Sequence, residues 1–344
     1  MSQFEGQVLI VDAGSDTCKT GLGGCNAPQL VFPTVVRDIN ENNNHFHTVN
    51  SRPVQSGIIV DWDAMEKIYR YIFSVYELQP ILLTELSQTP KIHREKLTTL
   101  MFEQFALPAT YMSVQSLLSL YACGKTTGLV LECGHEISQA VPIVDGTVLE
   151  ASLQQWQVGG RDLTLHLQER IHKGSGVKLE DDDVKFIKEN VGRVWNVGEE
   201  DLCEMVCVLP DGKTLTVQDF ERKLCAEPLF QPKLIGKSDM GIHNMVFNSI
   251  TSSSMDYKTV LYQNIVLSGG STMFNGFSNR LSQELERMEK ARIRMDVFTP
   301  DFNRQYSSWI GGSILSSLSS FETMWITREE YNEEGPTVVH RKCL

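Results

Sequence analysis

The chain has 344 residues, of which 41% are hydrophobic and 22% are charged, so it can bury the cores of two ordinary domains. Its formal net charge of −12, without a long lysine or arginine run, argues against direct binding to nucleic-acid phosphates. No apolar run approaches the ~20 residues that span a bilayer, and the eight cysteines show neither zinc nor disulfide spacing, so we expect no membrane insertion and reduced thiols.

The first part of the sequence predicts strands that alternate with helices. An apolar strand over residues 8–11 ends at Asp12 in a glycine-containing turn, and a second strand starts at Cys18. Asp61 is placed to cap a helix whose apolar residues recur at three and four positions. Three further elements follow: a strand over 80–84, a helix over about 97–105 and a strand over 111–114. This alternation predicts an α/β domain.

The second part repeats the opening plan. An apolar strand from residue 128 reaches Glu132, a glycine turn at Gly134 and another strand over 137–143. Acidic residues at 180–183 open a further helix, since acids suit a helix N-terminus. A third glycine turn follows a strand over 264–268 and precedes a helix. Backbone N–H groups at such a turn favour a nucleotide or another anion.

Several runs, in order along nearly the whole chain, resemble actin and the actin-related proteins. They include VDAGS at 11–15, WDAMEKI at 62–68, GRDLT at 160–164, LPDG at 209–212, LSGG at 267–270, WIGGSIL at 309–315 and GPTVVHRKC at 335–343. Sugar kinases and the Hsp70 ATPase domain share the superfamily, but their motifs do not match these runs. A kinase-like or chaperone-like enzyme is therefore disfavoured.

The resemblance implies an α/β fold of the actin type, in the ribonuclease-H-like or Hsp70-ATPase superfamily, with two domains and four subdomains around a central nucleotide cleft. The first half is expected at 1–120 and 310–344 (subdomain 1, with a reduced subdomain 2 at about 34–57). The second half is expected at 121–309 (subdomain 3, with a reduced subdomain 4 at about 160–245). The polar run 40–45 is expected to form a loop.

The resemblance also implies a site for ATP or ADP with Mg²⁺. Asp12 and Lys19 match the first phosphate loop, where the carboxylate serves the water shell of the metal ion and the ammonium serves the phosphates. Glu132 is the second acid expected to reach the metal ion through water, and Gln115 matches a glutamine that positions the attacking water. The other matching cofactor residues are Gly14, Ser15, Gly134, Lys188, Glu189, Gly269, Gly270, Thr272 and Met273.

Each of these residues also has a purely structural interpretation, Asp12 as a turn former, Lys19 as a solvated strand residue and Gln115 as a helix cap. The departures from the family pattern fall on the phosphate side. Asp16 replaces a glycine and adds bulk and negative charge. In the second loop, Glu132, His135 and Glu136 stand where the family has Asp, Asp and Gly. Gln139 replaces a histidine of the family, and Gln305 replaces a lysine on the adenine side. We therefore expect weak or no nucleotide binding and at most a weak ATPase, more in keeping with a non-catalytic protein.

A partner surface is expected at the opposite end of the first half. The residues that match the hydrophobic cleft in which actin-binding proteins insert amphipathic helices are Tyr121, Gly124, Thr126, Leu315, Ser319 and Met324. Core packing is the alternative, above all for Leu315. Shortened segments at 33–57 and at about 173–209 are expected to compromise filament contacts.

Two functions remain open at this point. The first is a structural or interaction subunit of a larger cytoskeletal assembly, with other actin-type subunits or actin-binding proteins as partners. The alternative is an active ATP-binding protein that copolymerises with actin-type filaments or caps them. The opening residues lack the basic start and apolar stretch of a secretory signal, so we expect a cytoplasmic, cytoskeletal location, while a nuclear one stays open.

Overall fold

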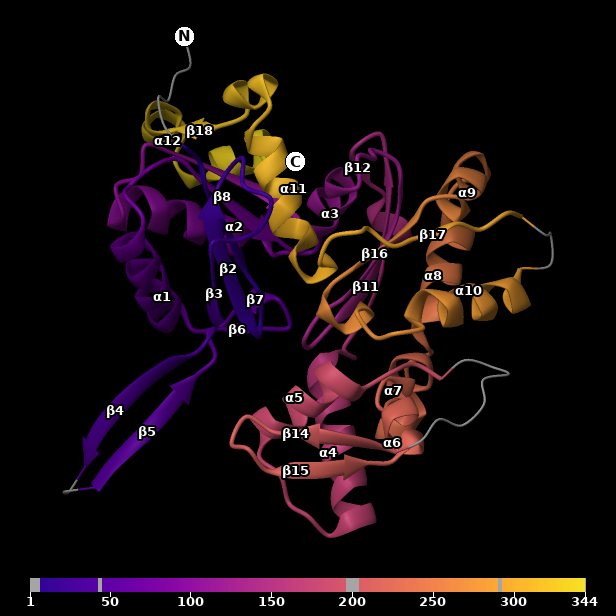
Figure 1. The fold of residues 1–344 in the computed structure, drawn as a ribbon. Helices are drawn as coiled ribbons and strands as arrows, with labels where there is room; N and C mark the ends of the chain where they lie inside the picture. The colour runs from indigo at the N-terminus through magenta and orange to yellow at the C-terminus, as the bar shows by residue number, and fades with distance from the viewer. Residues whose placement is uncertain (1–6, 43–44, 196–203, 290–292, 344) are drawn as a thin grey trace. The chain divides into compact units, whose positions relative to one another are not determined.

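The computed structural model describes residues 7–42, 45–195, 204–289 and 293–343. The chain divides into two compact units, Met1–Thr126 with Tyr306–Leu344, and Thr127–Gln305 (Figure 1). The expected divisions after residues 120 and 309 would instead cut helices α3 (Gln115–Ala122) and α11 (Ser307–Ser316). These two helices pack together within the first unit, with Ser119 Oγ 3.2 Å from Ser308 Oγ, so the boundaries fall outside them.

The first unit is built on a six-stranded sheet. Its strands are, in order, β18 (Ile326–Thr327), β9 (Ala109–Val114), β8 (Ile81–Glu85), β1 (Leu9–Ala13), β2 (Thr17–Leu22) and β3 (Leu30–Pro33). β1 is antiparallel to β2 and parallel to β8, which is parallel to β9. The carboxyl ends of β1, β8 and β9 therefore meet at one edge of the sheet.

Helices cover this sheet as the apolar periodicity predicts. α1 (Trp62–Val75) begins at Asp61, whose Oδ1 accepts the N–H of Ala64 at 3.0 Å, and it buries Met65, Ile68 and Ile72. The remaining helices are α2 (Lys91–Thr99) with a π-helical turn at Leu100–Gln104, α3, α11, α12 (Arg328–Glu334) and α13 (Val339–Lys342), with short 3-10 segments at Ser319–Thr323 and Pro336–Val338. The predicted capped helix is confirmed.

The segment expected to be a reduced subdomain 2 forms two small hairpins. β4 (Val36–Asn42) pairs with β5 (His45–Ser51), and β6 (Val54–Gln55) pairs with β7 (Ile58–Ile59) (Figure 1). The expectation of a loop over 40–45 is therefore wrong for residues 40–42 and 45, which lie in paired strands, while 43–44 lie outside the described residues. β-branched and aromatic residues along β5 favour the strand.

The second unit repeats the plan of the first. Its main sheet contains β12 (Thr147–Val148), β11 (Ser138–Val144), β10 (Gly128–Cys133), β16 (Ile265–Ser268) and β17 (Val297–Phe298), with β13 (Gln154–Trp156) paired to β11. β10 is antiparallel to β11 and parallel to β16, as β1 is to β2 and β8. The structure confirms the internal repeat that the sequence predicted.

Seven helices of the second unit surround its two described sheets. They are α4 (Gly160–Ser175), α5 (Asp181–Val191), α6 (Asp219–Leu224), α7 (Glu227–Phe230), α8 (Ile242–Ser252), α9 (Met255–Tyr262) and α10 (Phe277–Met288). The smaller sheet pairs β14 (Met205–Val208) with β15 (Thr214–Val217), and 3-10 turns occur at Glu150–Ser152, Pro232–Ile235, Gly270–Thr272 and Arg304–Tyr306. One continuous core runs through the unit from Leu129 to Leu285.

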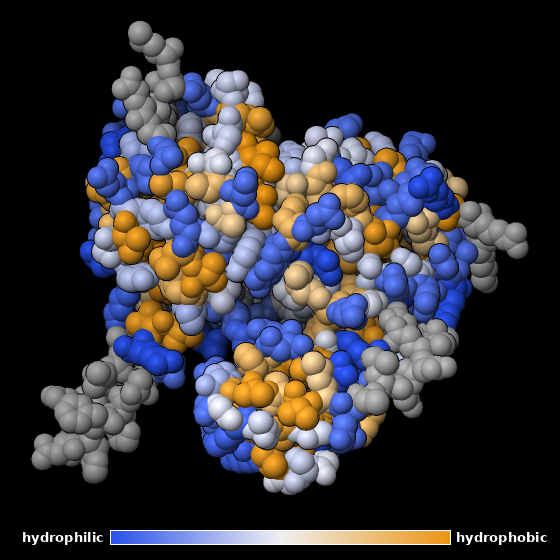
Figure 2. Space-filling view, in the orientation of Figure 1, coloured by the Kyte–Doolittle hydropathy of each residue, from blue (hydrophilic) through white to orange (hydrophobic). Residues whose placement is uncertain are grey.

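Apolar side chains are not confined to these cores. On the face shown in Figure 2, hydrophobic residues gather over α11 and over the β14–β15 ribbon, where Val206 and Val208 are exposed. In the described ranges, none of the helices combines the length and the apolar character that a bilayer span requires.

The contact between α3 and α11 gives the first prediction. A Cβ at Gly311 would overlap the carbonyl oxygen of Leu118. We expect Gly311→Ala to lower the free energy of unfolding by about 2–3 kcal/mol, because overpacking outweighs the ~1 kcal/mol that alanine gains in a helix. Urea unfolding followed by circular dichroism measures the change.

Gly312→Ala is the matched control in the same helix. Its Cβ would meet Ile10 Cγ2 at 3.1 Å and Leu82 Cδ2 at 3.3 Å, which are side-chain atoms that can shift. We expect a smaller loss of stability for Gly312→Ala, and equal losses in the two variants would contradict the close helix packing.

Candidate functional site

Asp12 is the centre of the first unit's polar site. It lies at the end of β1 with only 3% of its surface exposed. Lys19 is its cross-strand partner on β2, so the two side chains share a face of the sheet. The Lys19 Nζ lies 3.1 Å from Asp12 Oδ2. The ion pair neutralises a carboxylate that burial would otherwise destabilise.

Two further side chains donate hydrogen bonds to the same carboxylate. Thr84, near the end of β8, donates its hydroxyl to Asp12 Oδ1 at 2.7 Å. Gln115, the first residue of α3 after β9, places its Nε2 at 2.9 Å from Asp12 Oδ1 and 3.2 Å from Thr84 Oγ1. The structure thus brings together Asp12, Lys19 and Gln115, as predicted, and adds Thr84. Thr84 was missed as a site residue, because the pairing of β8 with β1 that brings it to Asp12 is visible only in the structure.

The turn between β1 and β2 is closed by its own hydrogen bonds. The N–H of Gly14 donates to the Thr17 carbonyl at 3.1 Å, and a Cβ at Gly14 would lie 3.4 Å from Lys19 Nζ. Ser15 Oγ accepts the N–H of Gly57 at 3.0 Å. The Thr17 carbonyl oxygen, at 3.2 Å, and the Lys19 ammonium thus already pack against the Cβ position of Gly14, and the Ser15 hydroxyl ties the turn to the β6–β7 hairpin.

The second unit has the same arrangement with different charges. Glu132 is the cross-strand partner of Gln139, as Asp12 is of Lys19. Gln139 Nε2 donates to Glu132 Oε2 at 2.9 Å. A neutral amide thus stands at the place where the first unit has an ammonium group.

Two glycine turns and the start of α4 meet at Gly134 in the second unit. The N–H of Gly134 donates to the Ile137 carbonyl at 2.8 Å. Its carbonyl oxygen accepts the N–H of Gly160 at 2.9 Å and the hydroxyl of Ser271 at 2.9 Å. These contacts join the β10–β11 turn, the start of α4 and the turn after β16. Ser271 was missed, because no local pattern shows which carbonyl its hydroxyl reaches.

The turn after β16 has the conformation that its glycines predict. Gly269 has φ +87°, and a Cβ there would overlap the Cys133 carbonyl oxygen, so only glycine fits. A Cβ at Gly270 would meet Gln305 Cβ at 3.8 Å, which is ordinary contact. Thr272 is buried and holds the turn, donating to the Gly269 carbonyl at 2.8 Å. Met273 is exposed.

Lys188 and Glu189 take different places although they are neighbours. Lys188 is buried, and its Nζ donates to the Gly160 carbonyl at 3.1 Å and to Thr164 Oγ1 at 3.0 Å. Glu189 is exposed on α5. The structure therefore brings Lys188 to the glycine turns and leaves Glu189 outside that cluster.

The residues expected to form a partner surface differ in how far they are exposed to solvent. Leu315 is 8% exposed and belongs to the core, which is the structural alternative noted for it. Near it in the sequence, Ile314 is 42% and Leu318 is 50% exposed. Tyr121 and Met324 are half-buried, and the exposed members of the predicted set are Gly124, Thr126 and Ser319. Ile314 rather than Leu315 is accordingly an exposed apolar residue of α11.

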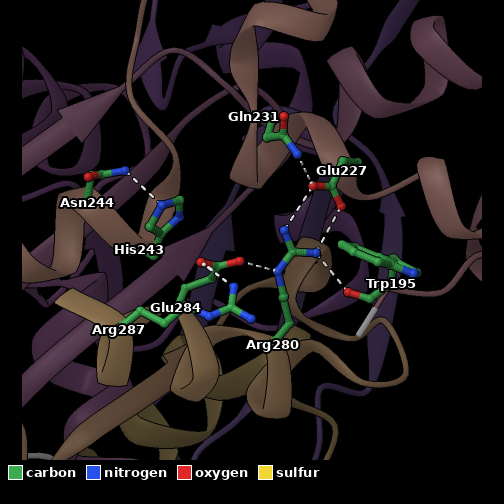
Figure 3. Close-up of polar contacts among 8 residues, drawn as sticks. All are labelled: Trp195, Glu227, Gln231, His243, Asn244, Arg280, Glu284 and Arg287. Atoms are coloured by element: carbon green, nitrogen blue, oxygen red, sulfur yellow. Dashed lines mark hydrogen bonds and ion pairs between the residues drawn. The ribbon is translucent and has the colours of Figure 1, made fainter. Parts of the chain in front are cut away.

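A buried ion cluster in the second unit escaped the sequence analysis altogether (Figure 3). The guanidinium of Arg280 on α10 binds both carboxylate oxygens of Glu227 on α7, at 2.9 and 3.1 Å. Its Nε donates to Glu284 Oε1 at 2.7 Å, and its NH1 donates to the Trp195 carbonyl at 2.8 Å. Burial lowers the pKa of the adjacent His243 below its ordinary value. The cluster joins α10 to α7 and has no feature of a ligand site.

A second buried acid lies next to Thr84 on β8. Glu85 Oε1 is 3.0 Å from Arg94 Nε, and Arg94 also donates to the Cys343 carbonyl at 2.5 Å. Glu85 Oε2 is buried without a hydrogen-bond partner among the described residues. Burial raises the pKa of Glu85 to about 7, although the Arg94 charge opposes this shift.

Two α/β units, each opening with a hairpin, an acidic residue and a glycine turn, define the actin-like class of two-domain proteins. A family model described as Actin matches residues 4–184 and 178–344, and the chain therefore belongs to the actin family. The family match and the mixed α/β architecture confirm the predicted actin-like two-domain fold.

The ion cluster gives the second prediction. Arg280→Met would leave Glu227 buried without its counter-charge, so we expect the free energy of unfolding to fall by about 3–5 kcal/mol. Arg287→Met is the matched control. Arg287 is 52% exposed on its side chain and pairs with Glu284 at 3.2 Å, so its loss is expected to change stability by less than about 1 kcal/mol. If Arg280→Met lowers the free energy of unfolding no more than Arg287→Met does, the buried cluster contributes little to stability.

The third prediction concerns pH. The pKa of Glu85 is higher in the folded protein than in the unfolded chain, where it has its ordinary value of 4.5. The unfolded state therefore binds fewer protons, and the stability from this group is full below pH 4.5 and is lost as pH rises through about 7. Relative to Glu85→Gln, we expect the wild type to lose on the order of 3 kcal/mol over this range.

Urea unfolding at several pH values tests this expectation. Glu77→Gln, at an exposed glutamate, should follow the wild-type pH profile. A Glu85→Gln profile parallel to that of the wild type would contradict the raised pKa of Glu85.

Proposed function

We propose that this chain is a structural subunit of a larger cytoskeletal assembly. The chain itself binds ATP or ADP with Mg²⁺ weakly and hydrolyses ATP slowly or not at all. The observation that carries the proposal is the Asp12–Lys19 ion pair, in which Asp12 also accepts hydrogen bonds from Thr84 and Gln115. The polar groups expected to serve a metal ion and phosphates thus already satisfy one another. Nucleotide binding must compete with these contacts.

The residues fit a magnesium–phosphate group in part. In the first unit, Asp12 is the carboxylate that would meet the water shell of the ion and Lys19 is the cation that would reach a phosphate. In the second unit, taken by itself, Glu132 is the carboxylate suited to the same role. When bound, the magnesium ion supplies positive charge that neutralises the phosphates. The backbone at Gly270, where an added Cβ would make only an ordinary contact to Gln305 Cβ at 3.8 Å, is suited to close approach of a ligand.

The surrounding charges oppose a polyanion. Asp16 adds a second carboxylate to the turn that carries Asp12 and Lys19. In the second unit, Gln139 provides no charge opposite Glu132, and Glu136 is paired with Arg161 at 3.3 Å. Because like charges repel, the Asp16 carboxylate opposes phosphate binding at the first turn, whereas the charge of Glu136 is offset by Arg161. His135 and Glu136 also add bulk to this loop.

The subunit role rests on the exposed apolar residues. Ile314 and Leu318 on the first unit and Val206 and Val208 on the second are hydrophobic side chains left in contact with solvent. An amphipathic helix of a protein partner is the occupant that the predicted surface at Tyr121, Thr126 and Met324 would take. A cytoplasmic, cytoskeletal location follows from this function. Purification that yields only a monomer, with no associated actin-type subunit, would count against it.

The alternative is an ATP-binding protein that copolymerises with actin-type filaments or caps them. The joint position of Asp12, Lys19 and Gln115 favours this alternative, since the predicted set for metal, phosphate and water lies together. Phosphate release measured with and without filaments separates the two functions, because the proposed subunit should show little of it in either condition.

The fourth prediction tests the role of Asp16 in nucleotide binding. We expect Asp16→Gly to tighten binding of Mg-ATP roughly tenfold, by removing a negative charge near the phosphates. A ligand that binds only the folded state raises the melting temperature by mass action, so a thermal-shift titration measures the change. Asp16→Asn, which keeps the bulk and removes the charge, should lie between Asp16→Gly and the wild type.

Two outcomes would contradict this account. If millimolar Mg-ATP raises the melting temperature of none of the three proteins, the chain has no nucleotide function at this site. If Mg-ATP raises the melting temperature of the wild type as much as that of Asp16→Gly, Asp16 does not weaken nucleotide binding.

A further inference from the structure

The hydrogen bonds around Asp12 have only one consistent direction. An ionised carboxylate accepts hydrogen bonds and cannot donate them, and Asp12 is such a carboxylate, paired with the Lys19 ammonium at 3.1 Å. The Thr84 hydroxyl, 2.7 Å from Asp12 Oδ1, must therefore donate its only hydrogen to Asp12. The oxygen of Thr84 then has lone pairs and no hydrogen for any other partner.

This direction fixes the side-chain amide of Gln115. Its Nε2 faces two acceptors, Asp12 Oδ1 at 2.9 Å and Thr84 Oγ1 at 3.2 Å. An amide turned by 180° about its last bond would place a carbonyl oxygen against a carboxylate oxygen and against a hydroxyl whose hydrogen is already used. Both orientations have similar shape, so the hydrogen bonds and not packing distinguish them.

We propose that Thr84 is a positioning residue that, with Asp12, orients Gln115 so that its carbonyl oxygen is the end offered to a ligand. The N–H₂ end of the amide faces these two acceptors of the first unit, and Oε1 remains as an acceptor. Gln115 then binds a ligand group that donates a hydrogen, namely a water molecule.

The orientation of Gln115 rests only on contacts within the first unit, whereas the presence of a nucleotide beside that water rests on the proposed function. A merely structural Thr84 would contribute to stability without affecting the Gln115 amide. The test therefore needs a readout at that amide, in protein without nucleotide. Selective ¹⁵N labelling of glutamine provides it, because side-chain N–H₂ signals report hydrogen bonding directly.

The experiment compares Thr84→Val, which removes the hydroxyl and keeps the shape, with Thr84→Ser, which keeps the hydroxyl. The N–H₂ pair of Gln115 is assigned as the pair lost in Gln115→Met. In the wild type we expect its hydrogens to exchange with water more slowly than those of Gln55, which is exposed. Thr84→Val should accelerate this exchange about fivefold or more, as for the loss of one hydrogen bond, and Thr84→Ser should restore the wild-type rate.

Equal Gln115 exchange rates in the wild type and Thr84→Val would overturn the proposal, as would a Thr84→Ser rate equal to that of Thr84→Val. If Thr84→Val does not fold, the exchange rates in the wild type test the proposal. Gln115 side-chain hydrogens that exchange as fast as those of Gln55 would contradict a fixed orientation of the Gln115 amide. Adding Mg-ATP to the wild type separates the two claims. A protected Gln115 pair that does not respond to Mg-ATP supports the positioning role and overturns the nucleotide function.

Discussion

A buried negative charge at the end of β1 is the constraint on which the first unit's site depends. Asp12 is nearly inaccessible to solvent, and a charge in that position is tolerated only when it is paired and hydrogen-bonded. The groups that satisfy it come from three other elements, Lys19 from β2, Thr84 from β8 and Gln115 from α3. One carboxylate therefore holds the ends of neighbouring strands and the start of a helix at the same edge of the sheet.

The second unit repeats this backbone plan, but the acidic residue at the end of its first strand has a different partner. The cross-strand partner of Glu132 is a neutral glutamine, and the glycine turns are joined through the Gly134 carbonyl rather than through an ion pair. Lys188 is buried against the start of α4 by contacts to Gly160 and Thr164. The two units thus share a backbone plan, and these polar groups are paired within each unit. Such a protein can hold its structure through its own contacts and needs less from a bound ligand.

Local patterns in the sequence predict much of this organisation. The Asp61 cap and the apolar face of α1 depend on near neighbours in the chain, as do the repeated hairpins. The pairing of Asp12 with Lys19 follows from the register of one short hairpin. The family resemblance then singles out Gln115 and the glycine turns. The structure brings Gln115 to Asp12 and leaves Glu189, another residue of that set, exposed.

Contacts between distant segments could not be predicted in this way. Thr84 reaches Asp12 only because β8 lies beside β1, and Ser271 reaches Gly134 only because β16 lies beside β10. In α11, which is apolar on most sides, the pattern does not tell whether Ile314 or Leu315 faces the core. The partners of Arg280 come from α7 and from the chain before it, and no local signal announces them.

The central claim is that the folded chain does not depend on a tightly held nucleotide. The most direct test is to purify the protein without added nucleotide, denature it, and quantify the released ATP and ADP by chromatography against the protein concentration. The account predicts far less than one nucleotide per chain in a protein that is folded and cooperative in unfolding. One nucleotide per chain, retained through purification, would contradict it.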